Sequence, residues 1–389
     1  MRREIKTEKL PIKMWLDDAE AGAIEQARNL ANFPFAVKHI ALMPDCHQGF
    51  GMPIGGVMAT QEVIVPNAVG VDIGCGMCAV QTSLTEISRP DMLNILSGIR
   101  SRVPVGFKHH KQKQDESLMP DRDPYAIMPV VEREYDSATK QIGTLGGGNH
   151  FIEIQKGSDG HIWVMVHSGS RNIGYKVADY YNRMAVRLNE KWNSSVPKAH
   201  QLAYLPLDSR EAQQYINEMN YCIDFALASR KLMMENTLKV IKSHLGGNIQ
   251  TAPMINIAHN YASFENHFGQ SVVVHRKGAT KADKNTVGII PGSQGANSYI
   301  VKGKGNKDSF ESCSHGAGRT MGRKQAIRSL DLEKEKKKLD EMGIIHSIRS
   351  RNDLEEASSA YKDITKVMQY QDDLVDIVCE LSPLAVVKG

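Results

Sequence analysis

The stretch Val71-Asp72-Ile73-Gly74-Cys75-Gly76 lies among short apolar runs, bounded by glycine, that dominate the first third of the chain. It places a carboxylate and a thiol three positions apart, and its glycines permit a tight backbone that turns both side chains toward one point. The apolar runs at 40–43, 54–59, 63–65, 69–73 and 77–81 are typical of strands. The pattern therefore predicts a sheet whose turns carry the chemistry.

Four histidines occupy comparable settings further along the chain: His150 after three glycines and an asparagine, His167 before Ser-Gly-Ser-Arg, His259 before Asn-Tyr, and His315 before Gly-Ala-Gly-Arg. A single histidine is more often structural, and the chain has 14 of them. These four, however, each have neighbours suited to tight turns and to hydrogen bonds that orient the ring. Together with Asp72 and Cys75 they form a mixed donor set that suits Mn, Fe, Co or Zn better than Mg or Ca. The set predicts a two-metal site.

The rest of the sequence alternates between strand and helix patterns. Apolar runs at 162–166, 272–274, 288–290 and 299–301 predict strands, and 150–154 alternates so that His150 and Glu153 point to opposite faces. Helical periodicity covers 176–192 and 209–240, and charged helices are expected over 322–342 and again near 372–381. Neither a linker nor a domain-length repeat interrupts the pattern, so one domain over 1–389 is expected.

Composition narrows the class of protein without naming its partner. The chain has 389 residues and a net charge of +4, too close to balance to establish a polyanionic partner. Six scattered cysteines and the absence of a secretory pattern favour a reducing compartment, and we expect a cytoplasmic protein. No apolar run approaches the roughly 20 residues needed to cross a bilayer, so no membrane association is expected.

The segment His315-Gly316-Ala317-Gly318-Arg319 suggests a different kind of site. Small residues let a phosphate approach the ring, and an arginine can bind phosphate with two donors. A largely neutral imidazole can attack phosphorus directly, whereas a lysine would first need its pKa lowered. Neither a Walker A motif nor a Lys-x-Asp-Gly motif is present, so a nucleotide would be captured in another way.

A basic cluster follows Phe107 in a predicted loop: Lys108, His109, His110, Lys111 and Lys113. Its composition fits a solvated loop. It also fits an RNA contact in which the aromatic ring stacks on a base.

In order and spacing, these motifs resemble those of the RtcB family of GTP- and Mn-dependent RNA-splicing ligases, from Met43-Pro44-Asp45 through the His315 segment to Val387-Lys388-Gly389. The resemblance implies an α+β fold: a single large domain with mixed β-sheets that hold a dinuclear metal site at strand ends, with peripheral helices. It also implies two Mn ions bridged by Cys75, with Asp72 and His150 on one ion and His167 and His259 on the other. His315 would become guanylylated. By the same resemblance, GMP would contact Asn149, Glu153, Ser293, Ala317, Gly318, Tyr361 and Lys388, and Arg171 and Arg319 would hold phosphates of RNA or nucleotide.

The family reaction joins an RNA 2′,3′-cyclic phosphate or 3′-phosphate end to a 5′-hydroxyl end through a 3′-phosphate-GMP intermediate, in RNA repair or tRNA splicing. An archease-like activator is a further partner that the resemblance implies. This chain has Gln294 where the family usually has Met, and Cys78 where Asn is common. The metal ligands alone would serve equally well in a dinuclear metallophosphoesterase that acts on RNA phosphate ends without GTP, and a catalytically silent RNA-binding protein is a third possibility.

Overall fold

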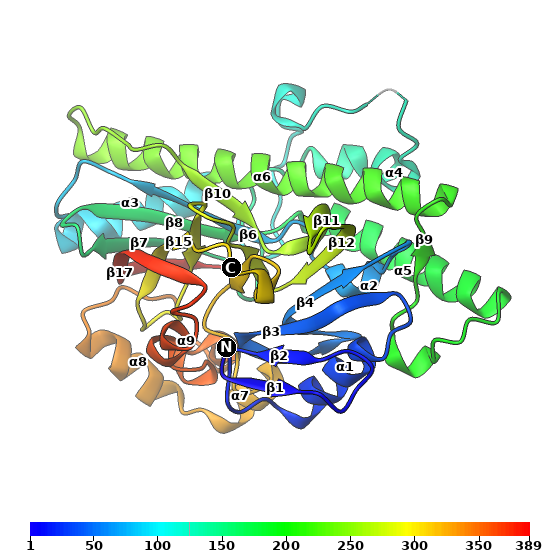
Figure 1. Ribbon diagram of the computed structural model, residues 1–389. Coiled ribbons are helices and arrows are strands. Elements are labelled where there is room, and N and C mark those ends of the chain that lie inside the picture. Colours follow the sequence, from blue (N-terminus) through cyan, green and yellow to red (C-terminus); the bar gives the residue numbers. More distant parts are fainter. Residues whose placement is uncertain (124) are drawn as a thin grey trace.

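The computed structural model describes residues 1–123 and 125–389, and its helices and strands form two large sheets with helices around them (Figure 1). A six-stranded sheet has the order β1-β2-β3-β4-β12-β11, and only its β2–β3 pair is parallel. Helix α1 (Ala21–Ala31) makes the crossover that this parallel pair requires. The strands are β1 (Arg3–Ile5), β2 (Ile12–Met14), β3 (Ala36–Phe50), β4 (Met52–Thr60), β11 (Asn260–His267) and β12 (Gln270–Lys277).

A seven-stranded antiparallel sheet has the order β10-β6-β8-β7-β17-β15-β14, and its outer strands β10 and β14 contact each other, so that the sheet curls on itself. Its strands are β6 (Gly76–Gln81), β7 (Phe151–Gly157), β8 (Ile162–Ser168), β10 (Ile255–Ala258), β14 (Val287–Ile290), β15 (Ser298–Gly303) and β17 (Val375–Lys388). One face packs on α3 (Arg89–Arg102) and on α6 (Arg210–Leu245), the long helix at the top of Figure 1. Met77, Met165, Ile300 and Leu381 form a buried cluster on the other face.

The remaining elements connect and cover the sheets. They are β5 (Val63–Ile64) with β9 (Leu205–Pro206), β13 (Ala279–Lys281) with β16 (Ser312–Ser314), α2 (Pro66–Val69), α4 (Pro129–Ala138), α5 (Arg171–Lys191), α7 (Arg323–Ser329), α8 (Leu332–Glu341) and α9 (Ile364–Gln369). The expected α+β fold is therefore confirmed, although "mixed" applies to one sheet and the other is wholly antiparallel.

Two expected elements were wrong. Residues 69–73 form no strand, because Pro66 begins the short helix α2 and the chain then turns, with Gly74 at φ 73°. The expected helix at 372–381 is instead a turn at 372–374 followed by the start of β17, which pairs with β15 on one side and β7 on the other. Pro383 lies beside a register shift in this strand, as expected for proline inside a sheet. Tertiary pairing thus decided a segment that local periodicity misassigned.

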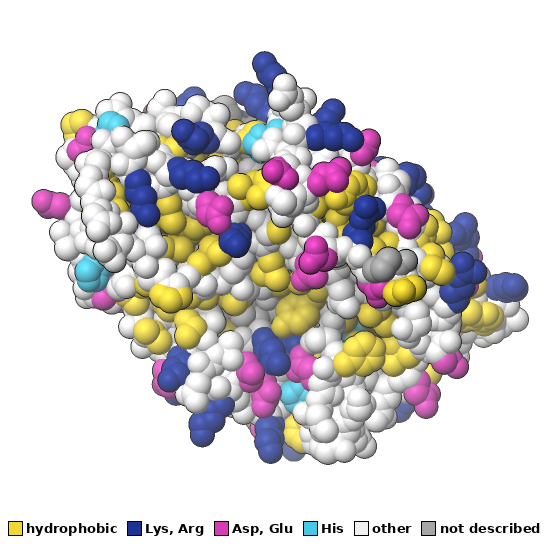
Figure 2. Space-filling view, turned by 90° about the horizontal axis from the view of Figure 1, so that it is seen from above, with side chains coloured by type: hydrophobic (Ala, Val, Ile, Leu, Met, Phe, Trp, Pro, Cys, Tyr) yellow, Lys and Arg dark blue, Asp and Glu magenta, His cyan; other side chains and the backbone are white. Residues whose placement is uncertain are grey.

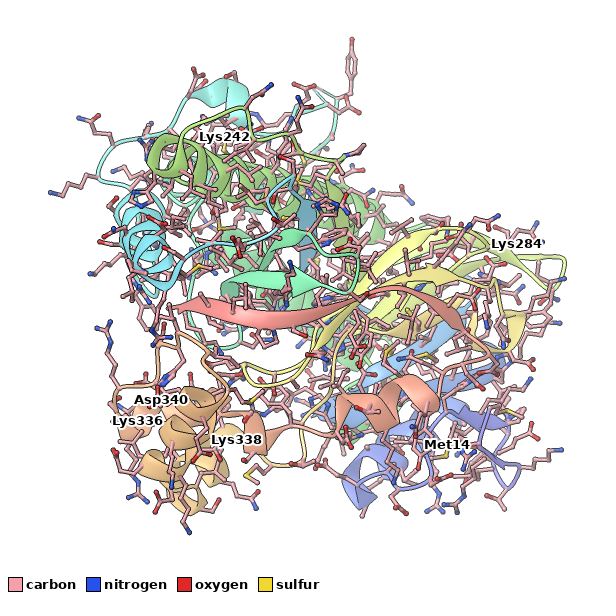
Figure 3. The ribbon with its side chains drawn as sticks, turned by 90° about the vertical axis from the view of Figure 1, so that its left-hand side faces the viewer. Met14, Lys242, Lys284, Lys336, Lys338 and Asp340 are labelled. Carbon is pink, nitrogen blue, oxygen red and sulfur yellow. The ribbon has the colours of Figure 1, made fainter. Side chains whose placement is uncertain are left out.

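The surface carries both signs of charge. On the face shown in Figure 2, Lys and Arg side chains are interspersed with Asp and Glu. Helix α8 lies at the margin of the molecule, as expected for a charged helix, and Figure 3 shows its side chains Lys336, Lys338 and Asp340 there. None of the helices in the described ranges is both long enough and apolar enough to span a membrane.

Candidate active site

Four neighbouring strand ends meet at one edge of the seven-stranded sheet. Because adjacent strands are antiparallel, the starts of β6 and β7 lie beside the ends of β8 and β10; the register pairs Gly76 with Ala258, and pairs His167 with both Met77 and Phe151. Cys75, His150 and His259 each lie one residue beyond a strand end, and His167 is the penultimate residue of β8. The topology thereby gathers side chains that are up to 184 positions apart, from 75 to 259, at a single point.

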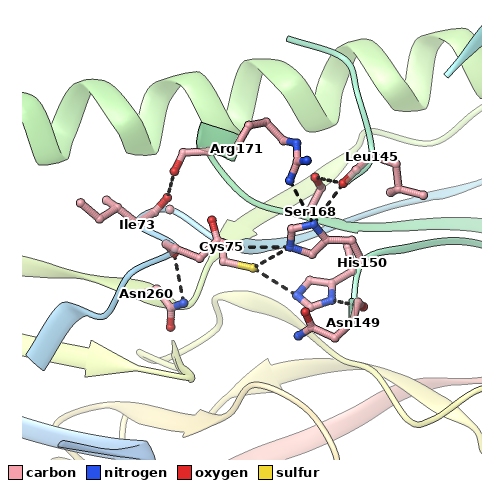
Figure 4. A network of polar contacts seen from close by, with 12 residues as sticks. Ile73, Cys75, Leu145, Asn149, His150, Ser168, Arg171 and Asn260 are labelled. Atoms are coloured by element: carbon pink, nitrogen blue, oxygen red, sulfur yellow. Dashed lines mark hydrogen bonds and ion pairs between the residues drawn. The ribbon is translucent and has the colours of Figure 1, made fainter. Parts of the chain in front are cut away.

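These side chains form two overlapping groups that could hold metal ions. One group is Asp72, Cys75 and His150, and the other is Cys75, His167 and His259, with the ligand atoms of each group within 4.8 Å of one another. The Cys75 sulfur lies 3.6 Å from Nε2 of His150 and 3.3 Å from Nε2 of His167 (Figure 4). Cys75 is the member common to both groups.

Backbone carbonyls orient two of the imidazoles. Nδ1 of His150 lies 3.0 Å from the carbonyl oxygen of Leu145, and Nδ1 of His167 lies 3.0 Å from that of Asn149. Since a carbonyl only accepts, each Nδ1 carries a proton, and Nε2 of His167 faces Cys75 with its lone pair. Nε2 of His150 lies between the Cys75 sulfur and Oδ2 of Asp72, which is 3.2 Å away. His259 is buried and its Nδ1 has no hydrogen-bond partner among the described residues. A metal ion is one way to satisfy such an atom.

The electrostatics of the group fit a cation. Burial, aided by the neighbouring Asp72 carboxylate, raises the pKa of the Cys75 thiol well above its usual value. Burial likewise lowers the pKa of His167 and of His259 well below the usual range, so that both rings are neutral at pH 7. Neutral imidazoles and a thiol that needs a nearby cation to ionise suit a borderline metal such as Mn, Fe, Co or Zn.

His315 stands beside this group and has its own partner. It follows β16, and its ring centroid lies 4.7 Å from that of His259. Nδ1 of His315 is 2.6 Å from Oδ2 of Asp45, and the His315 backbone N–H donates to the same oxygen at 3.0 Å. Asp45 is fully buried; burial would raise its pKa, but His315 holds that pKa below its usual value. An ionised Asp45 accepts a hydrogen bond from Nδ1–H of His315, which leaves the lone pair of that ring on Nε2, where it could act as a nucleophile or base.

The part of β3 that carries Asp45 is packed against the segment that follows His315. Gly318 has φ 75°, and a Cβ there would lie 2.2 Å from the carbonyl oxygen of Asp45. Lys362 donates from Nζ to the carbonyls of Pro44 at 3.0 Å and Cys46 at 2.6 Å, and its backbone N–H donates to Gly318 at 2.9 Å. The pair of Asp45 and His315 is therefore held from both sides.

A second polar group surrounds the buried carboxylate of Glu356. Arg319 donates to it at 3.2 Å, Arg323 donates at 2.9 Å, and the Lys388 ammonium lies 3.9 Å away. Tyr361 donates its hydroxyl to Glu356, and the Arg319 guanidinium lies 5.0 Å from the centroid of its ring. The structure thus brings Tyr361, Lys388 and Arg319 together, but it commits Arg319 to protein partners.

The other predicted nucleotide contacts lie nearby. Glu153 of β7 is buried on the face opposite Ile152 and Ile154, as the alternation predicted, and burial raises its pKa to about 8 despite the nearby Lys388. Ala317 packs in one buried cluster with Tyr361, and Gly316 lies against Pro291, two residues before Ser293. Asn149 contributes its carbonyl to His167.

Arg171 begins α5 just beyond the metal-ligand candidates. Its Nη1 lies 3.4 Å from Nδ1 of His150, and its Nε lies 3.4 Å from Oγ1 of Thr144. Figure 4 shows its guanidinium next to His150 and Ser168. A cation is therefore available at the margin of the site.

Three residues that the sequence did not single out support the site from behind. Arg230 of α6 is fully buried and donates to the carbonyls of Gly74 and Ser168, both at 2.9 Å. Asn260 donates to the Asp72 carbonyl at 3.1 Å and accepts from the Gly278 N–H at 2.7 Å. Glu356 carried no local signal, whereas a basic residue on the apolar face of a long amphipathic helix was a visible hint for Arg230.

Comparison with known proteins agrees with this geometry. Residues 26–389 match the family model described as tRNA-splicing ligase RtcB. The chain is 39% identical to the RNA-splicing ligase RtcB of Escherichia coli K12, over 99% of each chain. It is 33% identical to the tRNA-splicing ligase RtcB of Nanoarchaeum equitans (98% of this chain and 95% of that one) and 30% identical to that of Thermococcus kodakarensis (99% and 96%). The chain therefore belongs to the RtcB family.

Proposed function

We propose that this protein is a GTP-dependent RNA ligase that joins RNA 2′,3′-cyclic phosphate or 3′-phosphate ends to 5′-hydroxyl ends, in RNA repair or tRNA splicing. The observation that carries the proposal is His315, whose Nδ1 is bound by a buried aspartate and whose ring adjoins a metal-competent cluster. That arrangement suits group transfer through a histidine adduct. A phosphoesterase that needs no nucleotide is not favoured, because family membership and the His315 pair both point to a ligase.

In the proposed reaction, Nε2 of His315 attacks the α-phosphorus of GTP. A nitrogen–phosphorus bond forms, the bond to pyrophosphate breaks, and pyrophosphate leaves. Asp45 stabilises the positive charge that grows on the imidazole. An RNA 3′-phosphate oxygen then takes the GMP from His315, and the 5′-hydroxyl of the second strand attacks the activated phosphate and releases GMP.

Two Mn ions are the proposed metals, held by Asp72, Cys75 and His150 on one side and by Cys75, His167 and His259 on the other. Bound there, such ions would supply Lewis-acid charge to phosphate oxygens and activate water for opening of the cyclic phosphate. Cys75 and the buried imidazoles would hold them rigidly, because each side chain is fixed at a strand end.

For GMP, we propose contacts from Asn149, Glu153, Ser293, Ala317, Gly318, Tyr361 and Lys388. Glu153 and Lys388 lie on the paired strands β7 and β17. Arg171 has its guanidinium at the edge of the metal group, which supports a contact with an RNA phosphate. Arg319 would need to exchange a protein partner for phosphate, so its proposed contact with RNA is the weaker of the two.

We further propose that residues 1–389 act as one unit, because the metal group draws on 72–259 and the group around Glu356 on 319–388. Natural substrates would be broken RNAs with the stated ends, and an archease-like activator is a candidate partner.

The test is incubation with α-labelled GTP and Mn. The wild type should acquire an acid-labile GMP adduct, and His315→Ala should acquire none. Lys388→Met should weaken GTP binding, whereas Lys304→Met, at the exposed end of β15, should leave it unchanged. A wild type that never takes up label, or that cleaves RNA phosphate ends without GTP, would refute the proposal.

A further inference from the structure

The loop at 104–114 carries an aromatic side chain that no residue in the described ranges covers. Phe107 is fully exposed (103% of its reference area), and Lys108, His109 and Lys111 beside it are exposed as well. Phe107 is the one large apolar side chain that this loop exposes, since Val103 is buried and Val105 packs against the α3–α6 core. An isolated ring among cations makes a small amphipathic feature, far smaller than the apolar patch of a typical protein–protein interface.

Backbone hydrogen bonds hold this loop in place. Gly106 N–H donates to the Gly146 carbonyl at 2.9 Å, and Leu145 N–H donates to the Pro104 carbonyl at 2.9 Å. On the other side, His110 N–H donates to the Lys140 carbonyl and Gln114 N–H to the Thr139 carbonyl, both at 3.0 Å. Phe107 therefore projects from a loop fixed at both ends.

The same hydrogen bonds place the loop at the edge of the metal group. The Leu145 carbonyl is the acceptor for His150 Nδ1. Gly146 lies so close to Arg171 that a Cβ on it would be 2.2 Å from the guanidinium. The Phe107 Cα is about 3.8 Å from that of Gly106, so the backbone that carries the exposed ring is one residue away from the contact between Gly106 and Gly146.

The charges on the loop favour an anionic partner. No ion pair within the described residues engages Lys108 or Lys111, whereas Lys113 is paired with Asp136 at 2.7 Å. Burial lowers the pKa of His110, so this ring adds no positive charge at pH 7. A fixed aromatic ring flanked by free ammonium groups is the combination that binds single-stranded nucleic acid, the ring by stacking and the cations by contact with phosphates.

We propose that this loop is an RNA-end binding element, in which Phe107 stacks on a base near the reacting end while Lys108 and Lys111 contact neighbouring phosphates. The inference rests on the proposed ligase function and adds a recognition element outside the metal and nucleotide groups. Stacking is tolerant of base identity, so the element would hold RNA ends of many sequences.

Binding is the decisive measurement, because it needs no chemistry. Phe107→Trp places a fluorescent reporter at the loop, and subtraction of the wild-type signal removes the chain's three tryptophans. A single-stranded RNA with a 3′-phosphate should quench the added signal, and Phe107→Ala should weaken binding of that RNA about tenfold or more. Phe264→Ala, on the edge strand β11 and 57% exposed, is the matched control and should bind normally.

Catalysis then separates this inference from the ligase proposal. Phe107→Ala should take up GMP on His315 at the wild-type rate but show a raised KM for RNA, and Lys108→Ala with Lys111→Ala should reduce the salt dependence of binding. Unchanged fluorescence of Phe107→Trp on addition of RNA, or normal RNA binding by Phe107→Ala, would overturn the inference. It would also be overturned if binding of a protein activator were the only measurable role of the loop. If the wild type binds RNA through Phe107 but never takes up GMP, the ligase proposal fails and the loop inference stands.

Discussion

Replacement of Asp45 by asparagine tests the pair on which the proposed chemistry depends. One carboxylate oxygen of Asp45 accepts from both Nδ1 and the backbone N–H of His315, and its other oxygen is buried without a partner among the residues that the structure describes. Asparagine has nearly the same shape but no charge. It can keep one oxygen toward His315 only by burying its amide group where the unpartnered oxygen lay.

The magnitude follows from the geometry. With Nδ1 and Oδ2 2.6 Å apart, the centres of the two charged groups are about 4 Å apart, and their attraction at an effective dielectric of about 20 is roughly 4 kcal/mol. That attraction exists only while the imidazole carries positive charge, which it gains as Nε2 attacks phosphorus. Its loss should therefore slow GMP transfer to His315 by about a thousandfold, at roughly 1.4 kcal/mol per factor of ten.

The assay is the initial rate of adduct formation from α-labelled GTP with Mn, measured by rapid quenching. Thermal unfolding of the same samples checks that Asp45→Asn is folded. Asp373→Asn is the control, because Asp373 accepts from the Trp15 indole at 2.8 Å and has no hydrogen bond to His315. If Asp45→Asn is folded and forms the adduct within a few-fold of the wild-type rate, Asp45 does not act on His315 as the geometry indicates.

Three further predictions concern metal binding, loop packing and pH. Cys75→Ala should weaken both metal equivalents and His259→Ala only one, as measured by bound Mn after dialysis, because only Cys75 belongs to both groups; equal losses in the two variants would contradict a bridging role. Gly318→Ala should slow GMP transfer sharply, because its Cβ would overlap the backbone of Asp45 in β3, whereas Gly343→Ala, with a similar φ of 72° and no described atom within 4 Å of an added Cβ, should not; equal rates in the two variants would argue against the packing explanation. Burial lowers the pKa of His39 to about 4, whereas the same side chain has a pKa of about 6.5 in the unfolded chain. Between these two values the unfolded chain binds a proton that the folded chain does not, so this residue alone should lower the free energy of unfolding by about 2 kcal/mol at pH 5. Denaturant unfolding of His39→Phe should lose that part of the pH dependence, and an unchanged slope would show that His39 is not the cause.

The sequence predicted which side chains could form the site, because metal ligands and phosphate-binding turns need particular residue types in particular backbone settings. The structure brings Asp72, Cys75, His150, His167 and His259 together. Asp72 and Cys75 stand in a glycine-containing stretch, and each of the four histidines has a Gly, Asn or Ser neighbour suited to a tight turn, which can be recognised without a structure. The alternation at 150–154 also predicted correctly that Glu153 faces away from Ile152. The family resemblance is confirmed over residues 26–389. It also supplied the role that each residue is proposed to have in the reaction.

Local patterns failed where long-range pairing decided the outcome. The segment near 372–381 has charged residues at helical spacing, yet it is a strand because β15 and β7 offer it hydrogen bonds on both sides. Asp45 was visible only as part of a motif, and its contact with His315 joins residues 270 positions apart. Glu356, which gathers Arg319, Arg323 and Lys388, has no local signature at all.

The amino-acid sequence by itself thus determined which donors this protein possesses and the turns that expose them, since both are properties of neighbouring residues. Tertiary structure alone placed Cys75 within reach of both groups of candidate metal ligands and brought Asp45 into contact with His315. It also paired Lys388, near the C-terminus, with Phe151 in the seven-stranded sheet. The physical reason is that, in an antiparallel sheet, the start of each strand lies beside the end of its neighbour, whatever their separation along the chain. Convergence at that edge depends on strand order and register, and neither is encoded in any short stretch of sequence.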